Sequence, residues 1–550
     1  MMLENNGLMI ILVAISIVIW NISFFYRSRY MLHMMQLEGY SNGNYLKWLK
    51  EFRYKVFGTK INIPVIVSVI FPLITLIPGT GKKLLLPASI IVWSVLTIFS
   101  TEFKKENVKK DLVYTKRALR LLASMYIVNI LILVISVVIY CLISAEFFLY
   151  YPVLLIIGTL LYYIAPYTLC LANILVKPIE KAINQYYYDM AKSKVRSFEN
   201  LRIVGITGSY GKTSTKFITA TILEEKFNVL KTPESYNTPM GVSKVINNTL
   251  TDEYDAFVVE MGARKIGEIK EMAELAGPKI GVITSIGPTH LDTFINIDNI
   301  MKTKYELIES LPPDGIAIFN YDNQYVRKLA DKTFKEKILY GTENIELLDI
   351  YATNIEVSEF GSTFILNDKK GNSIKCETKL LGKHNIGNLL AGAAVGVALG
   401  LTFEEIARGI KKIEPVPHRL QLINPGTGVI IIDDAFNSNP VSSKAALDVI
   451  SQFREGRKII VTPGMIELGE EEEEANRQFG RYIGETCDYV ILVGKKRTIP
   501  IYEGIFEKDF KKDNVFVVNS LKEATEVLQK ILRPKDVVLF ENDLPDNYNE

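Results

Sequence analysis

The chain has 550 residues, of which 48% are apolar and 23% are charged, so an intrinsically disordered protein and a small disulfide-rich fold are excluded. The 63 Lys and Arg residues nearly balance the 61 Asp and Glu residues, and a net charge of +2 gives no reason to expect a nucleic acid as partner. The four cysteines are scattered without a Cys-x-x-Cys spacing, which supports neither a disulfide framework nor a zinc site.

Long apolar runs fill the first third of the chain, and each is close to the roughly 20 residues that a helix needs to cross a bilayer. Runs such as 131–143 have no polar face, which predicts membrane-spanning helices rather than buried helices of a soluble protein. The five runs are 8–25, 62–79, 84–100, 121–144 and 147–176. The second and third are short and contain prolines, so a re-entrant hairpin is the alternative for this pair.

Basic residues between the runs predict the orientation of these helices. Segments 26–60 and 101–120 carry seven Lys or Arg residues each, whereas the other two connections carry two or none. By the positive-inside rule the two basic segments face the cytoplasm. A multi-pass protein of the cell membrane is therefore predicted, with its N-terminus outside and everything after Lys177 in the cytoplasm.

From Leu201 the pattern changes to short β-branched runs that alternate with amphipathic helical stretches, which predicts parallel doubly wound sheets. The predicted strands are 202–207, 256–261, 280–285, 315–319, 429–433, 457–462, 489–494 and 515–518. A stretch rich in Thr, Ser, Asn and Gly at 350–378 predicts antiparallel hairpins, and Pro415 with Pro417 predicts a hinge.

Together these patterns predict an α-helical membrane region followed by two α/β domains. The membrane region is 1–176, with about five transmembrane helices, and 177–200 is a juxtamembrane linker helix. A P-loop ATPase-type doubly wound sheet is predicted for 201–414, and a smaller Rossmann-like domain for 415–550. The tyrosines and lysines of the linker suit a membrane surface, and a plain helical linker fits them equally well.

A phosphate-binding loop follows the strand at 202–207. Its residues are Gly208, Ser209, Tyr210, Gly211, Lys212, Thr213 and Ser214, and a helix begins there. Glycines let backbone N–H groups close around phosphates, a lysine neutralises their charge, and a Thr hydroxyl can hold Mg²⁺. The strict G-x-x-x-x-G-K-[ST] pattern fails by one place, because Ile206 stands where the first glycine is expected. The order of strand, loop and helix still predicts an ATP site.

This form of the loop resembles that of the Mur ligase family, and further motifs follow in the family's order between about residues 201 and 475. They are Glu260-Met261-Gly262-Ala263, Thr289-His290-Leu291-Asp292, Lys302-Thr303-Lys304-Tyr305-Glu306, Gly382-Lys383-His384-Asn385-Ile386-Gly387-Asn388, His418-Arg419-Leu420-Gln421 and Asp433-Asp434-Ala435-Phe436-Asn437-Ser438-Asn439-Pro440. The resemblance implies ATP and two Mg²⁺ ions as cofactors.

The resemblance also implies roles for individual residues. The metal ligands would be Thr213, Glu260, His290 and Lys304, the last of them carbamylated, with Lys302 as the alternative lysine. The residues that contact ATP would include Asn385, Asn388 and Arg419, and the catalytic set would be Lys212, His290, Lys304, Arg419 and Asp434. Taken without the motifs, His290 would be a loop or core histidine, Lys304 a surface charge and Arg419 half of an interdomain ion pair.

Within the family the motifs are most similar to the branch that adds D-alanyl-D-alanine. Two features depart from that branch. Membrane runs replace the soluble N-terminal domain that holds the UDP of the precursor, and Glu541-Asn542-Asp543 stands near the C-terminus in place of the usual K-G-S ending. Both departures leave the ATP chemistry untouched and bear on the identity of the substrate.

The function predicted from the resemblance is a membrane-anchored, ADP-forming amide-bond ligase. It would phosphorylate a carboxylate of a cell-wall or surface-polymer precursor and then join an amino acid or dipeptide to it through the acyl phosphate. Anchoring at the inner leaflet suggests a lipid-linked precursor. A poly-γ-glutamate-type capsule synthase is the alternative with the same chemistry. A membrane transport or signalling ATPase is the alternative of another class, and the scarcity of charges in the apolar runs disfavours it.

Overall fold

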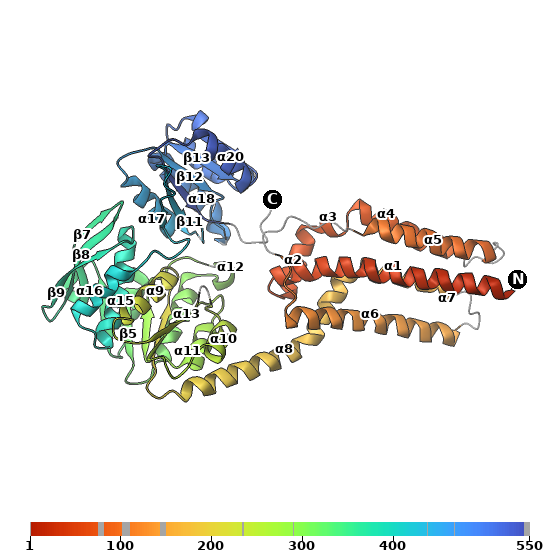
Figure 1. The fold of residues 1–550 in the computed structure, drawn as a ribbon, viewed down its shortest axis with the longest axis horizontal. Helices are drawn as coiled ribbons and strands as arrows, with labels where there is room; N and C mark the ends of the chain where they lie inside the picture. Colours follow the sequence, from red (N-terminus) through yellow and green to blue (C-terminus); the bar gives the residue numbers. More distant parts are fainter. Residues whose placement is uncertain are drawn as a thin grey trace. The chain divides into compact units, whose positions relative to one another are not determined.

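The computed structural model describes residues 2–74, 82–101, 111–143, 150–233, 236–289, 291–436, 438–466 and 468–543. They form two compact units, Met1–Ile183 and Asn184–Leu544. Figure 1 shows the first as a set of helices and the second as two sheets flanked by helices.

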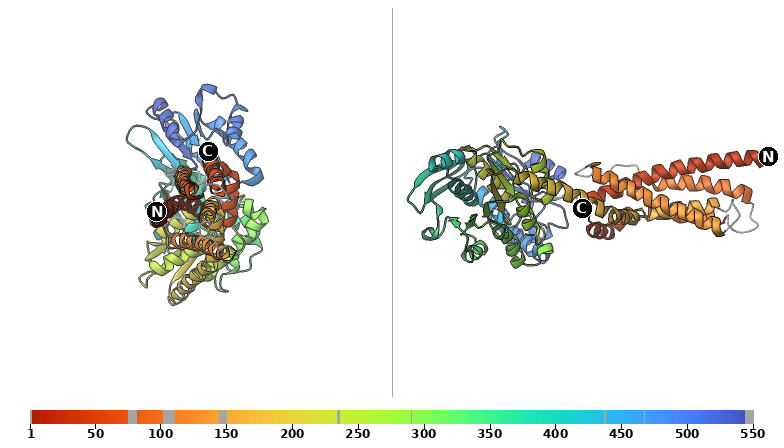
Figure 2. Two further views of the ribbon diagram at one scale, coloured as in Figure 1. Left: turned by 90° about the vertical axis from the view of Figure 1, so that its right-hand side faces the viewer. Right: turned by 90° about the horizontal axis from the view of Figure 1, so that it is seen from below.

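The first unit consists of helices alone among its described residues. They are α1 (Met2–Leu37), α2 (Asn42–Glu51), α3 (Arg53–Val56), α4 (Thr59–Ile74), α5 (Lys82–Ser100), α6 (Lys116–Ile143), α7 (Tyr150–Tyr163) and the first half of α8 (Ala165–Arg196). Figure 2 shows the long helices running alongside one another. Their shared core includes Phe24, on which the Trp20 ring stacks with centroids 4.7 Å apart.

Within the described part of this unit, two helices are long and apolar enough to cross a membrane, by length and composition. They are Ile11–Leu37 and Lys116–Tyr140. A third span results if Tyr151–Tyr163 and Ala165–Arg196 are counted as one broken helix, whose parts meet at an angle of 73°. The apolar helices Thr59–Ile74 and Leu85–Ser100 are shorter. The arrangement with five spans therefore remains a prediction.

The helix ends differ from the sequence interpretation in two places. Segment 26–60 is not an open loop, because α1 continues to Leu37 and α2 and α3 follow it. Arg27 consequently lies inside the helical unit, where its Nε donates to Tyr162 O at 2.7 Å. The carbonyls at the C-terminal end of a helix lack partners within it, and Arg27 satisfies those of α7 before the bend. The second difference is the linker, because α8 runs without a break from Ala165 through residues 177–196.

The second unit begins with a nine-stranded sheet in the order β2-β3-β1-β4-β5-β6-β7-β8-β9. The strands are β1 (Arg202–Thr207), β2 (Val229–Lys231), β3 (Ala256–Glu260), β4 (Ile280–Ile283), β5 (Ile316–Asn320), β6 (Lys337–Gly341), β7 (Ile350–Ser358), β8 (Gly361–Asp368) and β9 (Ser373–Thr378). Neighbours pair in parallel as far as β7, and β7, β8 and β9 pair antiparallel. The hairpins predicted at 350–378 are these last three strands, which Figure 1 shows at one end of the sheet.

Helices cover both faces of this sheet. They are α9 (Lys212–Leu223), α10 (Pro239–Asn248), α11 (Glu268–Ala276), α12 (Leu291–Phe294), α13 (Ile297–Glu309), α14 (Gln324–Asp331), α15 (Lys383–Ala398) and α16 (Phe403–Lys412). One buried cluster joins Val204, Ile206 and Val258 to α9, α15 and α16. The other joins Ile203, Phe257 and Val259 to α10, α11 and α13, because successive side chains of a strand point to opposite faces. The parallel strands are thus buried on both sides.

A second sheet follows, in the order β10-β11-β15-β12-β13-β14. Its strands are β10 (Gln421–Ile423), β11 (Ile430–Asp434), β12 (Lys458–Thr462), β13 (Tyr489–Val493), β14 (Val515–Val518) and β15 (Val537–Glu541). Its helices are α17 (Pro440–Ser451), α18 (Glu472–Thr486), α19 (Ile499–Phe506) and α20 (Leu521–Ile531). All pairs are parallel except β10 with β11. The eight predicted strands are all present, and the sequence interpretation missed β2, β6, β10 and β15.

Candidate active site

The site lies where β3, β1 and β4 end side by side, since these three strands are neighbours in the sheet. In parallel α/β sheets, ligands bind beyond the carboxyl ends of the strands. Thr207 and Glu260 are the last residues of β1 and β3, and Thr284 follows β4 directly. The chain therefore brings three segments that are far apart in sequence to one edge.

The phosphate loop requires its two glycines. Gly208 has φ +156°, and a Cβ added there would lie 2.1 Å from Thr284 Oγ1. Gly211 has φ +77°, and an added Cβ would lie 2.5 Å from Asn388 Oδ1. Thr284 Oγ1 also donates to Tyr210 O at 2.5 Å, which fixes the loop against β4. The backbone N–H groups at the start of α9 are thereby held at the sheet edge, where they favour an anion.

Lys212, the first residue of α9, lies folded over this loop. Its Nζ donates to Gly208 O at 2.9 Å and to Ser209 O at 3.0 Å. Burial lowers the pKa of Lys212, the nearby Glu260 carboxylate opposes that shift, and Arg419 adds to it. The ammonium thus bonds to the loop carbonyls and is attracted by the Glu260 carboxylate.

Glu260 and Thr213 form an oxygen pair that fits Mg²⁺. The Thr213 hydroxyl donates to Glu260 Oε1 at 3.1 Å, and Glu260 is only 1% exposed. Two neighbouring ligands in an octahedral Mg²⁺ shell, each about 2.1 Å from the ion, are about 3.0 Å apart. A hydroxyl and a carboxylate are hard oxygen ligands of the kind that Mg²⁺ prefers. Among the described residues, no group of three His, Cys, Asp or Glu side chains could hold a metal ion.

The remaining predicted metal ligands have different outcomes. His290 lies outside the described residues. Lys304, on α13, is 3% exposed, so it is not the surface charge that a lone helical lysine suggests. Burial lowers the pKa of Lys304 to about 7, repulsion from Lys212 adds to this shift, and Glu268 and Glu306 oppose it. A large fraction of this amine is therefore neutral near pH 7, which is the form that reacts with CO₂ to give a carbamate.

Glu306, two residues after Lys304, links α13 to α11. Its Oε1 accepts the N–H of Gly267 at 2.7 Å, and its Oε2 accepts the N–H of Lys270 at 3.0 Å. These N–H groups belong to the start of α11, where partners within a helix are lacking. The last glutamate of the Lys302–Glu306 motif thus anchors the helix that carries Lys304.

The two predicted asparagines meet the phosphate loop from α15. Asn388 Oδ1 accepts from Thr215 Oγ1 at 3.2 Å, and Asn388 Nδ2 donates to Asn385 Oδ1 at 3.0 Å. Asn385 Nδ2 in turn donates to Leu381 O at 2.8 Å. Residues one helical turn apart face the same side, so Asn385 can bond to Asn388. Asn388 is the one that contacts α9 beside Gly211, and Asn385 holds the Asn388 side chain in place.

The second sheet contributes Arg419 and Asp434. The Arg419 guanidinium lies 4.2 Å from the centroid of the Phe436 ring. Burial lowers the pKa of Arg419, and Asp434, Glu260 and Glu541 oppose that shift. Asp434, 7% exposed, accepts the N–H of Leu420 through Oδ1 at 3.2 Å. The charge of Arg419 is therefore shared between carboxylates of both sheets.

Glu541 forms a buried carboxyl pair with Asp434. The two end the neighbouring strands β15 and β11, where they are register partners, and Glu541 has no exposed surface. Ser438 Oγ donates to Glu541 Oε1 at 2.7 Å. Burial raises the pKa of Asp434 to about 6, and burial together with the Asp434 charge raises the pKa of Glu541 well above its usual value. Burial and the neighbouring Asp434 charge thus favour the neutral form of Glu541.

The sequence interpretation missed two residues that contact Glu260. Lys216 Nζ lies 3.1 Å from Glu260 Oε2, and Asn237 Nδ2 donates to Glu260 Oε1 at 3.0 Å. Lys216 follows Lys212 by one helical turn, so a lysine at this spacing within an apolar stretch was the available signal. No pattern marks Asn237, because the segment between β2 and α10 is placed by tertiary packing.

This arrangement brings cations to an anion-binding loop beside an oxygen pair for Mg²⁺. Lys212, Lys216 and Arg419 surround Glu260, and Lys304 lies near Lys212. Such a set can neutralise a triphosphate while a second anion approaches its terminal phosphate.

Comparisons with known proteins agree with these features. The family model described as the Mur ligase middle domain matches residues 206–396, and that of the Mur ligase glutamate ligase domain matches residues 418–541. The UDP-N-acetylmuramoyl-tripeptide–D-alanyl-D-alanine ligase of Escherichia coli is 35% identical over 303 residues, 55% of this chain and 66% of that enzyme. The enzyme of the same name from Bacillus subtilis is 31% identical over 341 residues, 62% of this chain and 72% of that enzyme.

Solved structures give the same result. A crystal structure of MurF from Acinetobacter baumannii has a TM-score of 0.60 and 26% identity, and covers 66% of this chain and 78% of that one. MurF from Thermotoga maritima in complex with ADP has a TM-score of 0.59 and 25% identity, and covers 66% of this chain and 80% of that one. The chain thus spans about two thirds of the E. coli enzyme's length.

Proposed function

Because this chain belongs to the Mur ligase family, whose members are ATP-dependent, ADP-forming ligases, we propose that it joins an amine to a carboxylate of a cell-wall precursor. The proposed amine is D-alanyl-D-alanine, which the names of the aligned bacterial enzymes support. The observation that carries the proposal is the cluster of Lys212, Thr213 and Glu260 at the ends of β1 and β3, with Arg419 electrostatically coupled to it.

The reaction would proceed in two displacements. An oxygen of the precursor carboxylate attacks the γ-phosphorus of ATP, the bond to the β-phosphate oxygen breaks, and ADP leaves. The nitrogen of the amine, after losing a proton, then attacks the acyl carbon, and inorganic phosphate leaves. Both reactants of the first step are anions, so the site must lower their repulsion.

Individual residues of the chain have distinct tasks in this mechanism. The N–H groups of Gly208 and of Tyr210 to Thr213 bind the phosphates, whereas the Ser209 N–H donates to Ser285 O at 2.6 Å and holds the loop. Lys212 turns from the loop carbonyls to the phosphate oxygens. Arg419 offers a planar fork to the transferred phosphate. Thr213 and Glu260 would hold Mg²⁺, which would supply Lewis-acid polarisation of the phosphoryl group.

Three further residues have supporting roles in the proposed mechanism. A carbamate on Lys304 and the imidazole of His290 would hold a second Mg²⁺, and the lowered pKa of Lys304 supports the first of these roles. Asp434 orients Arg419 from the second sheet. Movement about Pro415 and Pro417 would bring that sheet toward the phosphate loop and exclude water, which otherwise hydrolyses the acyl phosphate.

We further propose that the helical unit anchors this ligase in the membrane, with the sheets in the cytoplasm. Two to three candidate spans support anchoring, and large apolar side chains such as Ile127, Leu131 and Ile135 on α6 are more than half exposed. Exposed aliphatic surface of this kind suits lipid rather than water. An enzyme held there would be placed to use a lipid-linked precursor. The orientation is tested by placing single cysteines in the chain and labelling intact cells with a thiol reagent that cannot cross the membrane. An N-terminal cysteine that this reagent does not reach, but that a membrane-permeant reagent labels, contradicts the proposed orientation.

The ligase proposal is tested with the full-length protein in detergent. ADP release is measured with UDP-muramyl-tripeptide or its lipid-linked form, with D-alanyl-D-alanine, and with each omitted in turn. We expect release only when both a carboxylate and an amine are present. Release that needs neither substrate is the behaviour of a transport or signalling ATPase and contradicts the proposal.

A further inference from the structure

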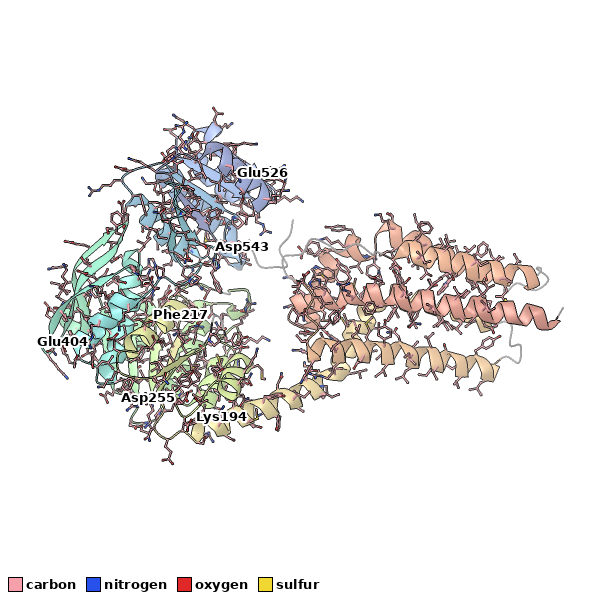
Figure 3. All side chains as sticks on the ribbon, in the orientation of Figure 1. Lys194, Phe217, Asp255, Glu404, Glu526 and Asp543 are labelled. Atoms are coloured by element: carbon pink, nitrogen blue, oxygen red, sulfur yellow. The ribbon has the colours of Figure 1, made fainter. Side chains whose placement is uncertain are left out.

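Lys216 is a buried cation that forms an ion pair with Glu260 inside the site. It lies on α9 and has no exposed surface, and its Nζ is 3.1 Å from Glu260 Oε2. The Glu260 side chain is equally buried at 1%. The ammonium also lies 4.6 Å from the ring of Phe217, the next residue, which Figure 3 labels. A lysine is almost never fully buried unless it is paired, so the contact with Glu260 is what allows Lys216 to be buried here.

The two oxygens of Glu260 therefore face different partners. Oε2 is engaged by the Lys216 ammonium, whereas Oε1 accepts from Thr213 Oγ1 and Asn237 Nδ2. Only Oε1 is on the side of the Thr213 hydroxyl, which is the other oxygen suited to Mg²⁺. A cation bound by Thr213 Oγ1 and Glu260 Oε1 would therefore share the Glu260 carboxylate with the Lys216 ammonium.

The local charge disfavours a divalent cation that arrives alone. Lys212, Lys216 and Arg419 all act electrostatically on one another or on Glu260. Like charges repel in proportion to their product, so a divalent cation is repelled by each of these cationic side chains twice as strongly as a monovalent one. The negative charges that restore the balance are those of the nucleotide phosphates.

We propose that Lys216 is a positioning residue that makes divalent-cation binding depend on the nucleotide. Its ammonium neutralises Glu260 in advance, so a free cation gains little from that carboxylate, and the cation enters together with ATP. The inference rests on the proposed function, since it assumes that Thr213 and Glu260 hold the cation of a metal–nucleotide complex. Lys216 would thus determine that the divalent cation binds with the nucleotide and not before it.

The test is a titration of the full-length protein with Mn²⁺, followed by electron paramagnetic resonance, with and without a non-hydrolysable ATP analogue. We expect Lys216→Met to bind Mn²⁺ at least tenfold more tightly than wild type when nucleotide is absent. With the analogue present, the difference between the two proteins should shrink. Unchanged or weaker nucleotide-free Mn²⁺ affinity in the variant overturns the inference.

Lys231→Met is the matched control. Lys231 lies 5.9 Å from the same Phe217 ring, but it is 31% exposed and pairs with Glu224 at 3.2 Å. It therefore changes the charge near α9 without touching Glu260, and its Mn²⁺ affinity should equal that of wild type. An effect as large as that of Lys216→Met would mean that net charge, and not the contact with Glu260, is responsible.

Two further measurements keep the result interpretable. Lys216→Gln keeps a hydrogen-bond donor for Glu260 but removes the charge, so it should reproduce the tighter Mn²⁺ binding if Lys216→Met does not fold. Wild type must bind the Mn²⁺–analogue complex, because its failure to do so would refute the proposed function rather than the role of Lys216. Wild type that binds the complex, with both Lys216 variants unchanged in Mn²⁺ affinity, refutes this inference alone.

Discussion

Replacing Gly211 by alanine should disable the phosphate loop, and the structure sets the size of the effect. The residue has φ +77°, and its new Cβ would lie 2.5 Å from Asn388 Oδ1. A left-handed conformation costs a non-glycine residue about 1–2 kcal/mol. Displacement of Asn388 also breaks its hydrogen bond with Thr215, worth about 1 kcal/mol.

These terms add to about 2–3 kcal/mol, which corresponds to a loss of about 30- to 150-fold in nucleotide affinity if the loop relaxes. If the loop keeps its shape, the same free energy is lost from folding stability instead. The assay is therefore calorimetric titration with a non-hydrolysable ATP analogue, paired with thermal melting of the same sample. Gly211→Ala that binds the analogue like wild type and melts at the same temperature would refute the reasoning.

A glycine on the facing helix provides the control. Gly387 lies beside Asn388 on α15, no atom lies within 4 Å of an added Cβ, and its φ is not in the positive range. Alanine in a helix interior is favoured over glycine by about 1 kcal/mol. Gly387→Ala should therefore raise the melting temperature slightly and leave nucleotide affinity unchanged.

Three other predictions concern buried charges. Burial lowers the pKa of Lys304 to about 7, so between pH 7 and its ordinary pKa of 10.5 the unfolded chain binds more protons than the folded one. The free energy of unfolding should therefore rise with pH over that interval by up to about 1.4 kcal/mol per pH unit. Thermal melting of Lys304→Met over the same interval should show a smaller rise. Glu541→Gln imitates the protonated acid and should change the free energy of unfolding by under about 1 kcal/mol at pH 7. Glu541→Leu loses the hydrogen bond from Ser438, and denaturant titrations should show a free energy of unfolding lower by about 2–3 kcal/mol. Burial raises the pKa of Asp536, which is 1% exposed, but its hydrogen bonds, above all those from Arg457, outweigh burial and hold this pKa below its usual value. The resulting stabilisation is present above the usual pKa and is lost as the pH falls through the folded pKa. Arg457→Met should therefore destabilise the fold by about 3–5 kcal/mol at pH 7 and by less near pH 3.

The sheets were predictable because their strands carry strong local signals. Runs such as 202–207 and 457–462 are β-branched and bounded by turns, and the structure has β1 and β12 there. The three residues of β2 show no period, and the short apolar runs 338–340 of β6 and 537–540 of β15 do not distinguish a strand from a buried helix. The helical unit was predicted less well, because hydropathy records apolar length but not the bend at Ile164.

The site was predictable where spacing within one element decides the geometry, as for Lys212 and Thr213 or for Asn385 and Asn388. It was not predictable where tertiary packing alone makes the contact. Lys216 reaches Glu260 across two elements, and Glu541 reaches Asp434 only because β15 pairs with β11. Because β15 was not predicted from the sequence, the contacts that its residues make at the site could not be predicted either.

The most direct test of the ligase chemistry follows an oxygen atom. The precursor is prepared with ¹⁸O in its acceptor carboxylate, and the phosphate released during turnover with ATP and D-alanyl-D-alanine is analysed by mass spectrometry. Because a carboxylate oxygen attacks the γ-phosphorus and leaves with phosphate, one ¹⁸O atom should appear in each phosphate released. Phosphate without ¹⁸O would show that ATP is cleaved without activating the carboxylate, and the proposed function would then be wrong.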